Sequence, residues 1–97
     1  MVNVKVVVSN ELGLHARAAA RFVQESCKFK SQVWLKKGSN RVNGKSIMGI
    51  LTLAAAKGEE VEIEVDGQDE EQALEILSTL VNAGFEEKKG IEKEAPC

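Results

Sequence analysis

The stretch EEVEIEVDG, residues 59–67, alternates apolar and acidic side chains without a break. In an extended chain its β-branched residues point to one side and its acidic residues to the other, so the stretch predicts a strand with one face in water. The stretch VNVKVVV, residues 2–8, has the same period, with a valine at every even position. Together the two stretches predict a sheet that is covered on one face only.

Two further segments have the three- and four-residue spacing of amphipathic helices. The first begins at about Ala16, and the second follows Asp69, whose carboxylate is expected to cap it. Gly84 is expected to end the second helix. The predicted apolar faces consist of Ala16, Ala19, Ala20, Val23 and Cys27 in the first helix and of Ala73, Leu77, Leu80 and Val81 in the second.

A hairpin and a short helix are predicted between these segments. Gln32–Lys37 has the pattern of a strand, a Gly-Ser pair at residues 38 and 39 suits a tight turn, and residues 40–43 form the return strand. Ser46 has the chemistry of an N-cap for the apolar run IMGILTLA that follows it. The order of elements therefore predicts an α+β fold, an open-faced β-sandwich with the helices on one face of an antiparallel sheet.

Composition limits the classes of function. A chain of 97 residues with 43% apolar and 29% charged residues is predicted to form one soluble domain, and its net charge of −2 does not favour nucleic acid or a membrane as a partner. No apolar run approaches the ~20 residues of a membrane span and no export signal is recognisable, so we expect a cytoplasmic protein. Cys27 and Cys97 lie far apart and there is only one histidine, so we expect no metal site and no cofactor.

That one histidine, His15, lies at the predicted start of the first long helix. Backbone N–H groups are unpaired there and the helix dipole is positive, so such a position binds anions and disfavours a protonated imidazolium. A neutral ring would leave one nitrogen able to act as a nucleophile. Arg17 adds a guanidinium whose geometry matches phosphate oxygens. The spacing alone is more typical of a histidine that only caps the helix.

Two separated motifs carry a family resemblance. GLHARAAARFV, residues 13–23, and VNGKSIMGILTLAAAKG, residues 42–58, closely resemble the HPr family, the histidine-containing phosphocarrier proteins of the bacterial phosphoenolpyruvate-dependent phosphotransferase system. The resemblance runs from residue 2 to about residue 88. It implies one HPr domain over residues 1–88 with the order βαββαβα, a four-stranded sheet of order 1423 and three helices on one face. Residues 89–97 are predicted to be a disordered tail.

The resemblance also implies a carrier rather than an enzyme. In this family the histidine accepts a phosphoryl group on Nδ1 from phosphorylated enzyme I and donates it to an enzyme IIA domain of a sugar permease, and His15 matches that residue. Arg17 matches the arginine that assists the phosphoryl group, and the backbone amides of Ala16 and Arg17 are expected to bind it. Partners are expected to dock on Ala20, Gln24, Ile47, Met48 and Leu51.

A second phosphorylation site is implied at Ser46. In many members of the family the serine before the short helix is phosphorylated by an HPr kinase/phosphorylase, which links the protein to a transcriptional regulator. A phosphate there would add about −1.5 to −2 charges beside the docking surface, and it would oppose an acidic partner without unfolding the helix. Without the resemblance, Ser46 is interpreted as an ordinary N-cap.

Two positions depart from the family pattern. Ala18 replaces the usual proline after the arginine, and Leu12 replaces a small polar residue next to the active loop.

One alternative function stays open: an HPr-like binding module that serves carbon or nitrogen regulation without sugar transport. A hydrolase built on His15 is disfavoured because no acidic partner or oxyanion loop is recognisable. We expect the protein to be a monomer.

Overall fold

The computed structural model describes residues 1–86 of the chain. The elements follow the order β1 (Val2–Val7), α1 (Ala16–Ser26), β2 (Gln32–Lys37), β3 (Asn40–Asn43), α2 (Ile47–Leu51), β4 (Glu60–Asp66), α3 (Glu70–Asn82) and a short 3-10 turn, η1 (Gly84–Glu86). This confirms the order predicted from the alternation and the helical spacing. The predicted tail, residues 89–97, lies outside the described residues.

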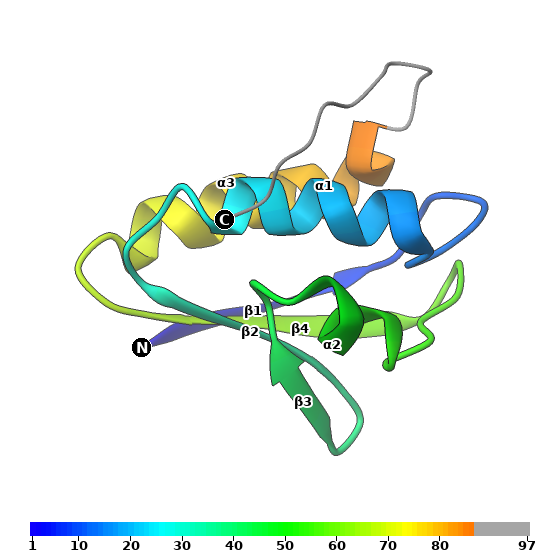
Figure 1. Cartoon of the computed structure of the whole chain (residues 1–97), viewed down its shortest axis with the longest axis horizontal. Helices are drawn as coiled ribbons and strands as arrows, with labels where there is room; N and C mark the ends of the chain where they lie inside the picture. The colour runs from blue at the N-terminus through cyan, green and yellow to red at the C-terminus, as the bar shows by residue number, and fades with distance from the viewer. Residues whose placement is uncertain (87–97) are drawn as a thin grey trace.

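The four strands form one antiparallel sheet in the order β1-β4-β2-β3. Ile63, in the middle of β4, is paired with Val4 of β1 on one side and with Leu35 of β2 on the other. Figure 1 shows α1 and α3 side by side above β1 and β4, and α2 packs against α1 and β3. The open-faced α+β sandwich of order 1423 is therefore confirmed.

The uncovered face of the sheet is polar, as the sequence predicts. Trp34 lies half-buried on this face, and the guanidinium of Arg41 stacks over its ring at 4.1 Å from the centroid. Arg41 also reaches across β2 and donates a hydrogen bond of 2.8 Å to Glu64 of β4. Because the cation covers the ring, Trp34 is shielded from water within its own sheet.

The buried face of α1 differs from the one predicted. Ala16 is exposed, and Ala20 and Cys27 are only half-buried. The buried residues of this helix are Ala18, Ala19, Phe22, Val23 and Ser26. Alanines occupy so much of this helix that their spacing fits several faces, and the single large side chain, Phe22, determines which one is buried.

The predicted apolar face of α3 is confirmed, but the predicted capping contact is wrong. Asp69 occupies the N-cap position of α3 without a capping hydrogen bond to that helix. Its carboxylate instead accepts the backbone N–H groups of Lys30 at 2.9 Å and Ser31 at 3.0 Å, together with the Ser31 hydroxyl. Hydrogen bonds from the Ser31 hydroxyl and the Lys30 amide lower the pKa of Asp69 to about 2. Asp69 therefore ties the α1–β2 loop to the start of α3.

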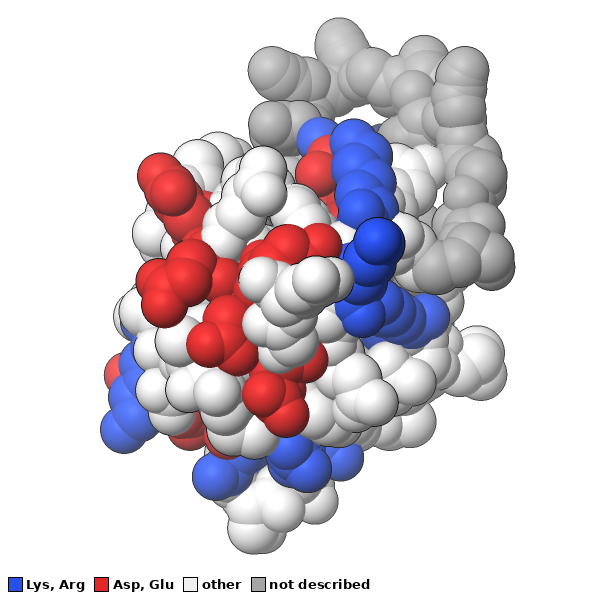
Figure 2. All heavy atoms as spheres, turned by 90° about the vertical axis from the view of Figure 1, so that its left-hand side faces the viewer, with Lys and Arg blue, Asp and Glu red and all other residues white. Residues whose placement is uncertain are grey.

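Charge is distributed unevenly over the surface. Figure 2 shows the end of the molecule at the left of Figure 1, where α3 begins, and acidic side chains crowd this face. The start of α1 lies at the other end of the molecule (Figure 1). Glu70 and Glu71 in the first turn of α3 belong to this acidic end, where they lie near the positive end of the helix dipole.

No helix within residues 1–86 is long and apolar enough to cross a bilayer.

Candidate functional site

His15 is the N-cap residue of α1. Its backbone is extended, with φ −85° and ψ −178°, and its Nδ1 accepts a hydrogen bond of 3.3 Å from the backbone N–H of Arg17. Because Nδ1 accepts this bond, its lone pair points towards the start of the helix, and it is the candidate nucleophilic atom of the ring. The side chain is half-buried. The sequence-predicted placement of His15 at the helix start is confirmed.

The loop before His15 is closed by short-range hydrogen bonds. The side-chain amide of Asn10 donates to the carbonyl of Gly13 at 2.8 Å, and the Gly13 N–H donates to the carbonyl of Asn10 at 3.2 Å. Gly13 has φ +68°, and a Cβ placed there would lie 2.6 Å from the carbonyl oxygen of Ala55. Only glycine fits this position without displacing backbone.

One further hydrogen bond fastens that loop to the rest of the molecule. The N–H of Leu14 donates to the Ala55 carbonyl at 2.9 Å. Leu14 itself is buried in the core. His15 is therefore held between a closed loop and the first turn of α1, so its ring nitrogen has a defined position.

The first residues of α1 form an anion-binding arrangement next to His15. Ala16 and Arg17 are both exposed and belong to the first turn of an eleven-residue helix, where the N–H groups have no carbonyl partner within the helix and that of Arg17 donates to His15 Nδ1. The Arg17 guanidinium makes no ion pair within residues 1–86. A phosphoryl group on Nδ1 would thus meet backbone donors and a cation within the same turn. Ala18, where the family has proline, is buried in this turn.

Ser46 is the N-cap of α2, as predicted, and its Oγ accepts the N–H of Gly49 at 3.0 Å. The predicted docking residues lie on two helices, α1 and α2, which contact each other. Met48 is 72% exposed. The other four, Ala20, Gln24, Ile47 and Leu51, are half-buried. Their role in docking stays a prediction.

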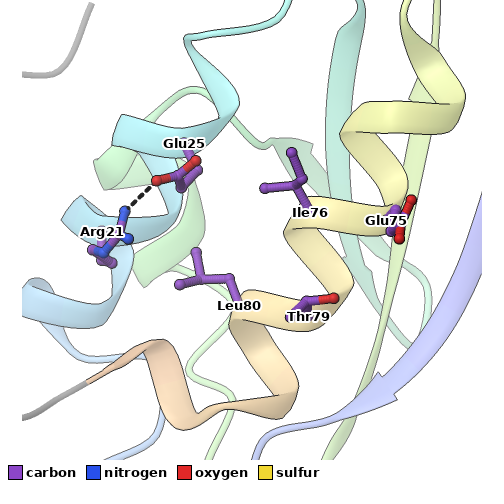
Figure 3. Close-up of a pocket in the computed structure, with 6 residues that line it drawn as sticks. All are labelled: Arg21, Glu25, Glu75, Ile76, Thr79 and Leu80. Atoms are coloured by element: carbon purple, nitrogen blue, oxygen red, sulfur yellow. Dashed lines mark hydrogen bonds and ion pairs between the residues drawn. The ribbon is translucent and has the colours of Figure 1, made fainter.

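A hollow of about 230 Å³ between α1 and α3 contains none of the predicted site residues. Figure 3 shows it open between Arg21 and Glu25 of α1 and Ile76 and Leu80 of α3. Arg21 and Glu25 form an ion pair of 2.7 Å, one turn apart on α1. Within residues 1–86 there is no group of side chains suited to hold a metal ion.

The comparisons with known proteins agree with this geometry. The family described as "PTS HPr component phosphorylation site" matches residues 2–83. The chain belongs to this family. The HPr phosphocarrier protein of Neisseria meningitidis is 51% identical over 87 residues, which cover 90% of this chain and 98% of that protein. The HPr-like protein Crh of Bacillus subtilis is 49% identical over 81 residues, 84% of this chain and 95% of that protein.

Solved structures of HPr have the same fold. A crystal structure of HPr from Thermoanaerobacter tengcongensis superposes with a TM-score of 0.86 at 44% identity, covering 91% of this chain and 99% of that one. A second crystal structure from that organism, described as an HPr dimer, has a TM-score of 0.71 at 45% identity, covering 90% and 100% of the two chains. The monomeric state predicted from the sequence has no support from these relatives.

Sequence reasoning missed one group of residues that supports the loop before His15. Lys37, at the end of β2, follows Val33 and Leu35 on the side of the strand that faces the helices. Its ammonium reaches the segment that carries Ala55, where Ala54 has an unusual φ of +50°. The signal in the sequence was the two-residue alternation of β2, which places its last residue, the charged Lys37, on the same face as Val33 and Leu35.

Proposed function

We propose that this HPr-family protein is a phosphocarrier that accepts a phosphoryl group on Nδ1 of His15 from phosphorylated enzyme I and donates it to an enzyme IIA domain. The observation that supports this most is the position of Nδ1 at the N-terminus of α1, where it accepts the Arg17 N–H. A nitrogen nucleophile lies there next to donors for three phosphoryl oxygens. The protein would then be a substrate of other enzymes and catalyse no reaction of its own.

The transfer requires one nitrogen–phosphorus bond to form as another breaks. The lone pair of His15 Nδ1 attacks phosphorus while the bond to the donor nitrogen of enzyme I breaks, and the donor recovers its own lone pair. The amides of Ala16 and Arg17 and the Arg17 guanidinium stabilise the negative charge of the transferring group. The first turn of α1 carries no acidic side chain that could activate water beside this nitrogen, and this favours transfer over hydrolysis.

The proposal is tested by mass spectrometry of the intact protein after incubation with enzyme I and phosphoenolpyruvate. The wild type should gain the mass of one phosphoryl group, and His15→Ala should gain none. The adduct should disappear in acid, because a phosphoramidate on imidazole hydrolyses there whereas a serine phosphoester survives. An adduct on the His15→Ala variant, or none on the wild type, would contradict the carrier function.

We also propose that Ser46 is a regulatory phosphorylation site for an HPr kinase/phosphorylase, through which the protein would act on a transcriptional regulator. The hydroxyl caps α2 beside the exposed Met48, so a phosphate would add negative charge at the edge of the predicted docking surface. Ser46→Asp should slow transfer from enzyme I without lowering stability, with Ser46→Asn as the uncharged capping control. Equal rates for the two variants would refute charge-based regulation.

The regulatory module without sugar transport is the second candidate, because the B. subtilis relative at 49% identity is named an HPr-like protein. His15 with Arg17 favours the carrier, since a module that only binds partners needs no nucleophile. Donation to enzyme IIA separates the two candidates. We expect a cytoplasmic protein that is monomeric in solution, which size-exclusion chromatography with light scattering would test.

A further inference from the structure

The ammonium of Lys37 joins three oxygen atoms from a single loop. Its Nζ donates to the carbonyls of Leu53 at 3.2 Å and Ala54 at 3.3 Å, and it forms an ion pair of 3.0 Å with the carboxylate of Glu59. The side chain is 30% exposed, so these contacts are partly removed from water. A lysine has three donors, and each has an acceptor here.

The partner carboxylate fixes the same loop from its other end. Glu59 accepts the N–H of Ala56 at 2.8 Å, and the Glu59 N–H returns a hydrogen bond of 3.0 Å to the Ala56 carbonyl. The hydrogen bond from Ala56 and the ion pair with Lys37 lower the pKa of Glu59. The carboxylate is therefore ionised at neutral pH, and the loop is bound at both ends.

The backbone between those ends is strained. Ala54 has φ +50°, a left-handed conformation that costs a non-glycine residue about 1–2 kcal/mol. Such a conformation persists only where its surroundings hold it. At Ala54 two hydrogen bonds supply that constraint: the Ala54 N–H donates to the Leu51 carbonyl at the end of α2 at 3.1 Å, and Lys37 donates to the Ala54 carbonyl.

The next residue, Ala55, is the one that receives the His15 loop. Its carbonyl accepts the Leu14 N–H at 2.9 Å and lies so close to Gly13 that no Cβ fits there. A second link between the two loops, the ion pair of Glu11 with Lys57, has side chains 81% and 53% exposed. A pair exposed to that degree contributes little. Two backbone hydrogen bonds join the start of the His15 loop to the same segment, from Gly58 to the Val8 carbonyl at 2.8 Å and from Val8 to the Glu59 carbonyl at 2.9 Å. The Ala55 carbonyl is the contact on the His15 side of the loop, and it fixes the residues next to the histidine.

We propose that Lys37 is a positioning residue for His15: by holding residues 53–56 it fixes the Ala55 carbonyl, which fixes the loop that places Nδ1 at the start of α1. The assignment rests on the proposed phosphoryl transfer for its functional consequence. Its structural half, the coupling of Lys37 to the Leu14 hydrogen bond, stands independently of any partner. Lys37 touches neither His15 nor the phosphoryl group, so it acts only through the loop.

Lys37→Met is the test variant, and Lys36→Met is its matched control, because Lys36 is the preceding residue of β2 and faces the open side of the sheet. Native-state hydrogen exchange should show the Leu14 amide exchanging about 10-fold faster in Lys37→Met than in Lys36→Met. The amide of Ile63, in the centre of β4, reports global unfolding and should exchange equally in both variants. Lys37→Arg, which keeps the donors, should restore most of the protection.

The transfer assay with enzyme I completes the test. With Lys37→Met as the substrate, the kcat of enzyme I should fall about 10-fold while its KM for this protein stays unchanged, because a misplaced nucleophile slows transfer without weakening docking. Equal protection of Leu14 in the two variants, or a rise in KM alone, would overturn the assignment. If wild type is not phosphorylated at all, the proposed function fails, while the exchange rates still decide whether Lys37 fixes the loop.

Discussion

Replacing Gly13 by alanine tests whether the His15 loop is packed against the loop that carries Ala55. An alanine at φ +68° costs about 1–2 kcal/mol, of which about 0.4–1 kcal/mol is returned through the lower entropy of the unfolded chain. The new Cβ would also lie 2.6 Å from the Ala55 carbonyl oxygen and 3.0 Å from the Ala56 Cα, both backbone atoms. Displacing these atoms adds about 1–3 kcal/mol. The lost Leu14 hydrogen bond accounts for about 1 kcal/mol of that amount.

Gly38→Ala is the matched control for this variant. Gly38 has φ +61°, and nothing lies within 4 Å of a Cβ built there, so it has the conformational cost without the overlap. Urea unfolding followed by circular dichroism should give a loss of about 3 kcal/mol for Gly13→Ala and about 1 kcal/mol for Gly38→Ala. If the two losses agree within about 0.5 kcal/mol, the packing of Gly13 against Ala55 does not constrain the loop.

Three further substitutions test other parts of the structure. Ser26 is fully buried and its hydroxyl has no hydrogen-bond partner in the described part of the chain, so Ser26→Ala should raise the free energy of unfolding by about 1 kcal/mol; a loss in urea unfolding would show that the hydroxyl is satisfied. Asp69 has its pKa lowered from 3.8 to about 2 in the folded protein, so its stabilising contribution is complete above pH 3.8 and is lost as the pH falls towards 2. The difference in Tm between wild type and Asp69→Asn should therefore shrink between pH 5 and pH 2, and a constant difference would contradict this assignment. Arg41→Ala should expose the Trp34 ring and shift its fluorescence to longer wavelength, with a loss of only about 0.5–1 kcal/mol; an unchanged spectrum would mean that Arg41 does not cover the ring in solution.

Local periodicity predicted much of this fold. The alternation in residues 59–67 and the valines of residues 2–8 placed β4 and β1 correctly, because a strand between core and water repeats every two residues. The start of α1 at Ala16 and the capping role of Ser46 also came from local chemistry. These features depend on neighbours in the sequence, so one sequence is enough to find them.

Contacts between distant segments were not predictable in the same way. The sequence pattern predicts that the carboxylate of Asp69 caps its own helix. In the structure this carboxylate instead accepts hydrogen bonds from Lys30 and Ser31, almost forty positions earlier. In the same way, His15 was placed correctly at its helix, whereas its support by Ala55 and Lys37 depends on the packing of loops. The predicted apolar face of α1 was partly wrong because alanine fits the core and the surface equally well.

The central claim is that Nδ1 of His15 holds the phosphoryl group against the N–H groups at the start of α1, and nuclear magnetic resonance of the phosphorylated protein tests it most directly. With the imidazole nitrogens labelled, a coupling to phosphorus should be found at Nδ1, and the amide protons of Ala16 and Arg17 should shift downfield as they bind the new oxygens. Coupling at Nε2, or amide protons that do not move on phosphorylation, would contradict the claim.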